Sequence, residues 1–506
     1  MHTKPIRVRF APSPTGPLHI GGVRTALYNY LFAKKNGGVF ILRIEDTDQA
    51  RFVSGAEEYI KNSLMWCGIA PTEGPGFGGE LGPYRQSERK KIYKPFIDEL
   101  ITKNMAYFAF DTAEELSKMR DEAKKQGLPN WQYNSVSRVG LKNSLSLSKD
   151  EVRKKLASKT PFVVRIKMPR NKTIRFHDEV RGWVSVNSNN IDDKVLFKSD
   201  GMPTYHLANV VDDYMMKISH VIRGEEWLPS APLHVFLYEA FGWEKPKFAH
   251  LPLILKPNGN GKLSKRDGDK LGFPVFPLNW KSNDGTVFPG YKEQGFFSIA
   301  FINMLAFLGW NPGTTQEIFS LAELCSSFSL ERVSKSGAKF DPDKTLWFQQ
   351  QHLRKTDNIV LAKQLQPFFK IEVSIEKLTF VCGLIKERAT FLLDIIKDGE
   401  YLVSSPDLLD KKTIKKRWKE DSKTQLECWY NELEKTSSFK AKDIEGLFLS
   451  FLKTNDIKMG AILPLFRFLI TGKNAGPSMF EIASFIGKKE CLKRINRGIK
   501  EITEEA

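Results

Sequence analysis

Cysteine is scarce in this sequence of 506 residues, which contains five cysteines and no C-x-x-C pair. The five are Cys67, Cys325, Cys382, Cys428 and Cys491. An odd number at wide spacings excludes a regular disulfide framework and argues against a zinc site built from cysteines. We therefore expect a protein of a reducing compartment, the cytoplasm.

Long hydrophobic runs are also missing. The richest run, FFSIAFINMLAFLGW at 296–310, falls short of the roughly 18 unbroken apolar residues of a membrane helix and predicts a buried helix instead. The first ten residues, MHTKPIRVRF, lack the apolar segment of a signal peptide, and the first motif begins at Arg9. We expect neither a membrane span nor a targeting segment.

Acidic residues are outnumbered, since 77 Lys and Arg stand against 59 Asp and Glu. A net charge of +18 fits either a basic surface or a polyanionic partner such as a nucleic acid, because Lys and Arg displace the counterions of phosphates. Charge alone carries no information about specificity. The length predicts two to four domains.

The N-terminal pattern predicts the start of a doubly wound parallel sheet. Residues 6–10 alternate as a strand does, and residues 11–22 form a loop dense in Pro and Gly. The next thirteen residues have the apolar spacing of a helix, which Asn36-Gly37-Gly38 should end. VFILRI at 39–44 is typical of a parallel strand buried on both faces.

These patterns predict an α/β protein with an all-α C-terminal half. Residues 1–106 and 201–270 form a split, Rossmann-like parallel-sheet domain, and residues 107–200 form an inserted α+β module. Residues 271–335 connect this domain to an all-helical region at 336–506, where strand patterns fade.

Two distant loops have the residues to hold phosphate groups. The first, at 14–22, places His19, Gly21 and Gly22 between a strand and a helix N-terminus. The second, Lys-Leu-Ser-Lys-Arg at 262–266, puts three cations beside flexible glycines. Taken singly, each also fits a plain structural role, as a turn with a solvated histidine or as an exposed basic loop.

As a pair, the two loops resemble the HIGH and KMSKS signatures of class I aminoacyl-tRNA synthetases. Longer strings are similar to glutamyl-tRNA synthetases of the bacterial type: RFAPSPTG, RIEDTD, GPYRQSER, PTYHLANVVDD and IRGEEW. The resemblance is dense over residues 6–270 and thinner in the helical half. It implies a Rossmann-like catalytic domain followed by an anticodon-binding half.

The resemblance implies an ATP-dependent ligase. Such an enzyme activates L-glutamate with ATP and Mg²⁺ to glutamyl-adenylate, and then transfers the glutamyl group to the 3′-terminal ribose of tRNA(Glu). Because the glutamate carboxylate is ionised at neutral pH, no protein nucleophile is needed, and the sequence has no triad signature. The family further suggests a monomer.

The resemblance also implies the roles of individual residues. The expected catalytic groups are His19, Lys262, Lys265 and Arg266, and ATP binding is expected of Thr15, His19, Gly21, Gly22, Glu226 and Lys265. Glutamate binding is expected of Arg9, Ser13, Glu45, Tyr205, Asn209 and Arg223. An arginine suits a carboxylate because it is always charged and pairs bidentately. The plain alternative for Arg223 is a surface ion pair with Glu225 or Glu226.

For tRNA, the inserted module should grip the acceptor end and the helical half should read the anticodon. Arg388, expected on a helix, stands where the family tends to place an anticodon contact, although a solvated helix face fits equally well. Some relatives hold zinc in the inserted module; residues 100–200 here contain no cysteine and only His177, so we expect no zinc. The long segment 267–294 has no assigned role.

The same features distinguish this family from four other kinds of protein. A glutaminyl relative would usually carry a C-terminal β-barrel half, and a shorter relative that glutamylates a modified tRNA base lacks the anticodon half. A non-catalytic RNA-binding module would be expected to lose His19 or Lys265, and a nucleotidyltransferase would not need the amino-acid pocket. Whether tRNA(Gln) is also charged stays open.

Overall fold

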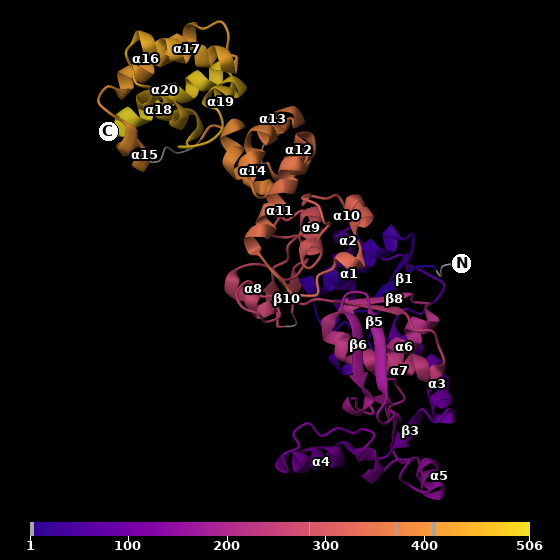
Figure 1. Ribbon diagram of the computed structural model, residues 1–506. Coiled ribbons are helices and arrows are strands. Elements are labelled where there is room, and N and C mark those ends of the chain that lie inside the picture. Colours follow the sequence, from indigo (N-terminus) through magenta and orange to yellow (C-terminus); the bar gives the residue numbers. More distant parts are fainter. Residues whose placement is uncertain (1–4, 283, 370–371, 407–410, 506) are drawn as a thin grey trace. The chain divides into compact units, whose positions relative to one another are not determined.

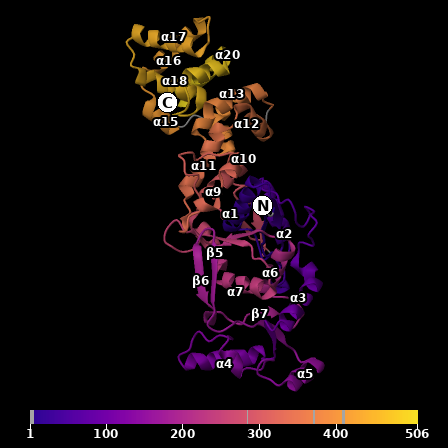
Figure 2. The ribbon, with the colours of Figure 1, turned by 45° about the vertical axis from the view of Figure 1, so that its right-hand side comes forward.

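The computed structural model describes residues 5–282, 284–369, 372–406 and 411–505. The chain divides into two compact units, Met1–Phe348 and Gln349–Ala506. Every strand of the described residues lies in the first unit, and the described part of the second is built from helices (Figures 1 and 2). None of the described helices is long and apolar enough to cross a membrane.

The first unit is built around parallel strands. β1 pairs with β2, β8 pairs with β9, and β5 continues beside β9, all in parallel, while β6 is antiparallel to β5. The Ser219 N–H donates to the Arg7 carbonyl at 2.9 Å and so joins the β1 and β8 edges. The strands are β1 (Arg7–Phe10), β2 (Val39–Leu42), β5 (Thr173–Asp178), β6 (Gly182–Asn187), β8 (His220–Gly224) and β9 (Lys247–Leu251).

Helices cover these strands. The expected first crossover is present: β1 leads into α1, which ends at Asn36 and a left-handed Gly37, as the sequence predicts. α6 and α7 bury Leu207, Val211 and Leu237 in the main apolar core, and both ribbon views show α7 against β5. The helices are α1 (Ile20–Lys35), α2 (Ala56–Trp66), α3 (Lys90–Thr102), α6 (Tyr205–Met215) and α7 (Ala231–Phe241).

A second, antiparallel sheet lies within the segment expected to be an insertion. β4 pairs with both β3 and β7. The hairpin β5–β6 also comes from this segment, but it is hydrogen-bonded to β9, with Asp178 opposite Phe248. Its buried residues Ile174 and Phe176 pack into the main core, as do Val164 and Ile166 of β4, so it is the strand pairing with β9 that sets the hairpin apart from the second sheet. The remaining elements are β3 (Ala106–Ala109), α4 (Ala113–Lys125), α5 (Lys149–Ala157), β4 (Val163–Ile166) and β7 (Val195–Phe197).

The connecting region packs directly on α1. The Tyr28 hydroxyl donates to the Ala306 carbonyl at 2.9 Å, and Arg24 donates to the Leu308 carbonyl at 2.7 Å. The predicted buried helix at 296–310 is therefore present as α9 and belongs to the first unit. The elements are β10 (Ile254–Leu255), α8 (Lys265–Leu271), β11 (Trp280–Lys281), β12 (Val287–Phe288), α9 (Ser298–Phe307), α10 (Leu321–Ser327) and β13 (Ala338–Lys339).

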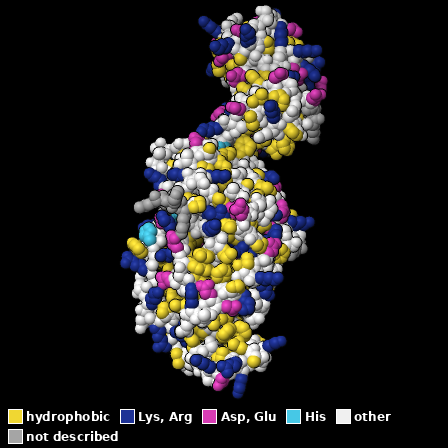
Figure 3. Space-filling view, turned by 90° about the vertical axis from the view of Figure 1, so that its right-hand side faces the viewer, with side chains coloured by type: hydrophobic (Ala, Val, Ile, Leu, Met, Phe, Trp, Pro, Cys, Tyr) yellow, Lys and Arg dark blue, Asp and Glu magenta, His cyan; other side chains and the backbone are white. Residues whose placement is uncertain are grey.

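The second unit is a helical bundle, as the sequence predicts. Trp429 is fully buried, with Phe448 and Phe466 against its ring. Lys and Arg side chains are spread over the visible face of both units rather than gathered in one stripe (Figure 3). α11 (Pro342–Lys355) crosses the unit boundary; the other helices are α12 (Asn358–Leu365), α13 (Ile375–Ile385), α14 (Leu392–Gly399), α15 (Lys411–Arg417), α16 (Ser422–Lys435), α17 (Ala441–Thr454), α18 (Met459–Thr471), α19 (Met479–Ile486) and α20 (Lys488–Glu505).

Arg388 does not lie on a regular helix, in contrast to the prediction. It is exposed and ends a short 3-10 turn, Lys386–Arg388, that follows α13. The break has a local cause: the Asp394 carboxylate accepts from the backbone N–H groups of Thr390 and Phe391, which starts a new helix at Leu392.

Candidate active site

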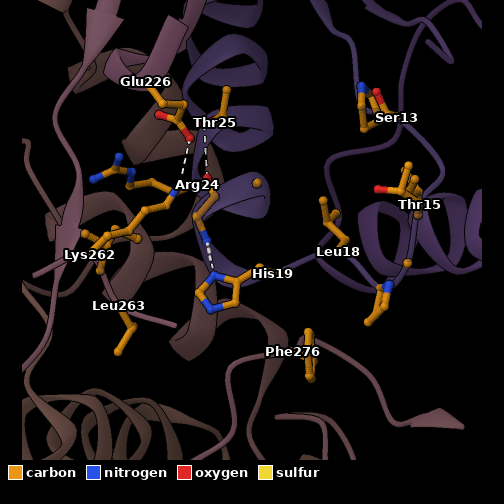
Figure 4. A pocket seen from close by; sticks show the side chains of 18 of the residues that line it. Ser13, Thr15, Leu18, His19, Arg24, Thr25, Glu226, Lys262, Leu263 and Phe276 are labelled. Carbon is orange, nitrogen blue, oxygen red and sulfur yellow. Dashed lines mark hydrogen bonds and ion pairs between the residues drawn. The ribbon is translucent and has the colours of Figure 1, made fainter. Parts of the chain in front are cut away.

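A cavity of about 560 Å³ lies where the two phosphate-type loops meet. His19, Gly21 and Gly22 line one part of it, and Lys262 and Glu226 line another (Figure 4). Thr15 also lies on its wall. The fold therefore brings together two loops that are some 240 residues apart in the sequence, as the resemblance requires.

His19 is held as a neutral hydrogen-bond donor. It caps the N-terminus of α1, and its Nδ1 accepts from the Gly21 N–H at 3.3 Å (Figure 4). Burial, and next the nearby Lys262, lower the pKa of His19 to about 4, so the ring is uncharged at neutral pH. With Nδ1 accepting, the ring proton lies on Nε2, which has no partner among the described residues.

The lysine loop contributes one described cation to the cavity. Lys262 Nζ lies 3.0 Å from Glu226 Oε1, and Leu263 is buried beneath the loop. Lys265 begins helix α8, but its side chain lies outside the part of the chain that the structure describes. Arg266 is exposed and does not line the cavity, so this predicted residue is not brought to it.

A smaller pocket of about 80 Å³ adjoins the large cavity. Glu45, Tyr205 and Trp227 line it, and Ser13 and Thr15 line both spaces. Four of the expected glutamate-binding and ATP-binding residues therefore meet at one pocket.

Two further predicted residues, Asn209 and Arg9, lie behind this pocket. Asn209 donates to Glu45 Oε1 at 3.1 Å, which leaves the other oxygen of Glu45 free of these donors. Arg9 donates to both carboxylate oxygens of Asp213, from Nε at 2.9 Å and from Nη2 at 3.3 Å. Part of the Arg9 fork is therefore already used inside the protein.

Arg223 is buried, so its predicted alternative, a surface ion pair, is wrong. The two candidate partners point elsewhere: Glu225 pairs with Arg181, and Glu226 pairs with Lys262. Arg223 instead donates from Nη1 to the Tyr205 hydroxyl at 2.9 Å. Among the described residues, no carboxylate forms an ion pair with Arg223.

Known proteins match this chain along nearly its whole length. Residues 5–347 match the family described as tRNA synthetases class I (E and Q), catalytic domain, and residues 360–499 match an anticodon binding domain. A glutamate–tRNA ligase of Christiangramia forsetii is 53% identical over 98% of both chains, and one of Flavobacterium psychrophilum is 53% identical over 98% of this chain and 99% of its own.

Solved structures agree with the sequence relatives. A glutamate tRNA ligase from Elizabethkingia meningosepticum, crystallised in complex with its amino acid, has a TM-score of 0.94 at 49% identity, over 99% of this chain and 100% of the other. The chain belongs to the glutamate–tRNA ligase family. The expected class I catalytic fold with a helical anticodon-binding half is confirmed.

The polar groups behind the glutamate–tRNA ligase pocket form a network that the sequence did not reveal. Arg43 is completely buried and donates to Asp213 at 2.7 Å and to Glu45 at 2.9 Å. Burial raises the pKa of Asp213, but Arg9 and Arg43 outweigh it and hold the pKa below its usual value. Burial likewise raises the pKa of Glu45, and here it outweighs the two arginines.

Sequence signals for these missed residues did exist. Arg43 lies in the quoted string RIEDTD, and Asp213 ends the string PTYHLANVVDD. Both are charged residues in apolar surroundings, a combination that requires a buried partner. In the described residues, no cluster of three His, Cys, Asp or Glu side chains has the geometry to hold a metal ion.

Proposed function

We propose that this member of the family activates L-glutamate with Mg²⁺-ATP to glutamyl-adenylate and diphosphate. It then transfers the glutamyl group to the 3′-terminal ribose of tRNA(Glu) and releases AMP. One observation carries the proposal: Ser13 and Thr15 line both the wide cavity and the small pocket, so a nucleotide and an amino acid can meet at that shared wall.

In the wide cavity, catalysis rests on positioning and charge. The substrate carboxylate attacks the α-phosphorus, and diphosphate leaves. His19 Nε2 donates to a phosphate oxygen, while Gly21 and Gly22 allow the nucleotide to approach the backbone. Lys262 and Lys265 supply positive charge to the phosphates as the α–β bond breaks, and Thr15 and Glu226 complete the ATP site.

In the small pocket, charged side chains recognise the amino acid. Arg223 and the unused N–H groups of Arg9 bind the side-chain carboxylate. Glu45 accepts from the α-ammonium group. Ser13, Tyr205 and Asn209 complete the polar lining.

The contacts with the tRNA are spread over the rest of the chain. Residues 107–200, without the hairpin β5–β6, grip the acceptor end against the catalytic domain at 1–106 and 201–270. Residues 271–335 contact the stem, and residues 336–506 read the anticodon, with exposed Arg388 as a candidate contact. The enzyme works as a zinc-free monomer in the cytoplasm; sedimentation and metal analysis of the purified protein test the first two points.

The decisive experiment is ATP–diphosphate exchange with each of the twenty amino acids, with and without tRNA, followed by charging of purified tRNAs. We expect exchange with L-glutamate alone and esterification of tRNA(Glu). Exchange with a different amino acid, or none in the presence of tRNA(Glu), would overturn the proposal. Charging of tRNA(Gln) in the same assay decides whether the enzyme has one or two tRNA substrates.

A further inference from the structure

A row of hydrogen-bonded groups runs behind the small pocket across three neighbouring strands. Asp178 ends β5, His250 lies on β9 and Arg223 lies on β8, where it is the register partner of His250. Asp178 Oδ2 lies 2.6 Å from His250 Nδ1, and Arg223 Nε donates to His250 Nε2 at 3.1 Å. All three side chains are buried.

The two carboxylate oxygens of Asp178 accept hydrogen bonds from different groups. Oδ1 accepts from three backbone N–H groups, those of Val180, Arg181 and His250, at 3.0, 2.9 and 3.2 Å. Oδ2 accepts from the ring of His250. Because a carboxylate can only accept, the His250 proton lies on Nδ1, and Nε2 offers a lone pair to Arg223.

Neutral groups occupy most of the remaining donors of Arg223. Nη1 donates to the Tyr205 hydroxyl and lies 3.4 Å from His234 Nδ1, and Nη2 donates to the Trp227 carbonyl. A guanidinium has five N–H bonds, so these partners together with His250 leave one, on Nη2. Burial raises the pKa of Tyr205 to about 12 and lowers the pKa of His234 well below its usual value, so both are uncharged.

The result is a buried cation whose orientation is fixed and which has no carboxylate in direct contact among the described residues. Arg9 and Arg43, by contrast, are each paired with Asp213. Taking a charge out of water without an opposite charge is unfavourable, and a bound carboxylate removes that penalty, whereas an amide does not. Arg223 is therefore arranged to favour an anionic side chain over its amide.

We propose that Asp178 and His250 are positioning residues for amino-acid selection: through the fixed tautomer of His250, they aim the unpaired charge of Arg223 at the side-chain carboxylate of the substrate. This inference rests on the proposed function. It assigns a selective role to the hairpin β5–β6, since Asp178 ends β5 and reaches Arg223 through His250.

Asp178→Asn is the sharpest test because it separates this role from turn capping. The amide oxygen should keep the Oδ1 position, where three backbone N–H groups converge, so the turn stays capped. The amide NH₂ then faces His250 Nδ1 and moves the ring proton to Nε2, against the Arg223 Nε–H. We expect the KM for glutamate to rise roughly tenfold or more, with the KM for ATP unchanged.

Two variants of His250 give an independent comparison. His250→Gln supplies an oxygen that can accept from Arg223, whereas His250→Leu cannot, so the KM for glutamate should rise far less in the first. His220→Gln is the matched control: His220 lies on the same strand as Arg223, but its Nδ1 lies 3.0 Å from the Ser219 hydroxyl and its ring packs against Phe32. We expect the control to keep the wild-type KM, and thermal unfolding shows whether each variant is folded.

The outcomes separate the two proposals. If the wild-type full chain shows no glutamate-dependent exchange in the presence of tRNA(Glu), the proposed function fails. If it does, but Asp178→Asn and His250→Leu both keep its KM for glutamate, the positioning role is overturned and Asp178 is only a turn cap. A parallel rise in the KM values for ATP and glutamate would also overturn it, because it would indicate a general distortion.

Discussion

The wide cavity and the small pocket share a wall but are built in opposite ways. The wide cavity, a space of about 560 Å³ between loops, has on its wall His19, whose Nε2 has no partner within the described ranges. The small pocket, about 80 Å³, is backed by buried charges that already hold one another, with Arg43 between Asp213 and Glu45. Under the proposed function, the nucleotide cavity therefore keeps polar groups available for the substrate, whereas the side chains behind the amino-acid pocket are oriented before the substrate binds.

The largest effect is expected where the fixed network is broken. Arg43→Met removes a buried cation and leaves Asp213 and Glu45 less compensated, so the free energy of unfolding should fall by about 3–5 kcal/mol. Denaturant unfolding of the full chain measures it. Lys262→Ala is the control from the open cavity, because its ion pair with Glu226 is exposed and should contribute less than about 1 kcal/mol. An equal loss of unfolding free energy in the two variants would contradict the distinction between the buried network and the open cavity.

The next largest effect is expected on catalysis in the wide cavity. His19→Ala removes the free Nε2–H donor and should lower kcat of ATP–diphosphate exchange by roughly 10²–10³. The KM for glutamate should stay close to the wild-type value, since His19 lines only the wide cavity. A large rise in that KM with kcat intact would show that the two spaces are not separate in function.

Arg223→Ala should have the opposite kinetic signature to His19→Ala, because Arg223 acts on glutamate binding in the small pocket. We expect the KM for glutamate to rise by about a hundredfold, while the KM for ATP changes little. Arg223→Lys should not restore it, because an ammonium group cannot reproduce the contacts to both Tyr205 and His250. Steady-state exchange kinetics give both constants, and an unchanged glutamate KM in Arg223→Ala would remove this residue from the pocket.

The smallest effect is a pH dependence. The folded pKa of His19, about 4, lies below its unfolded value, so between pH 6.5 and 4 the unfolded chain binds more protons and stability falls as the pH falls. His19→Asn should remove this contribution, about 2 kcal/mol between pH 7 and 5. Unfolding free energies of both proteins at the two pH values test it. The same slope in both would show that His19 titrates normally.

Local sequence patterns predicted the helices and strands that carry the site. Contacts between segments that are far apart in the sequence could not be predicted from such patterns. The β1–α1 unit follows from turn residues and helix spacing, whereas the meeting of the two loops was implied only by the family resemblance. The sequence showed the hairpin β5–β6 as a strand pattern but not which sheet it joins, because one contact at Asp178 with Phe248 decides that. The partners of Arg223 were likewise invisible, since they come from different elements and carry no periodic signal.

We propose that one nucleotide and one glutamate lie side by side across the wall that the two spaces share. A crystal structure of the full chain with a non-hydrolysable glutamyl-adenylate analogue tests it most directly. We predict the phosphate-mimicking group within about 3.5 Å of His19 Nε2 and the side-chain carboxylate at Arg223 Nη2. An analogue bound with its carboxylate in the wide cavity, or with its adenylate away from His19 and Lys262, would contradict the account.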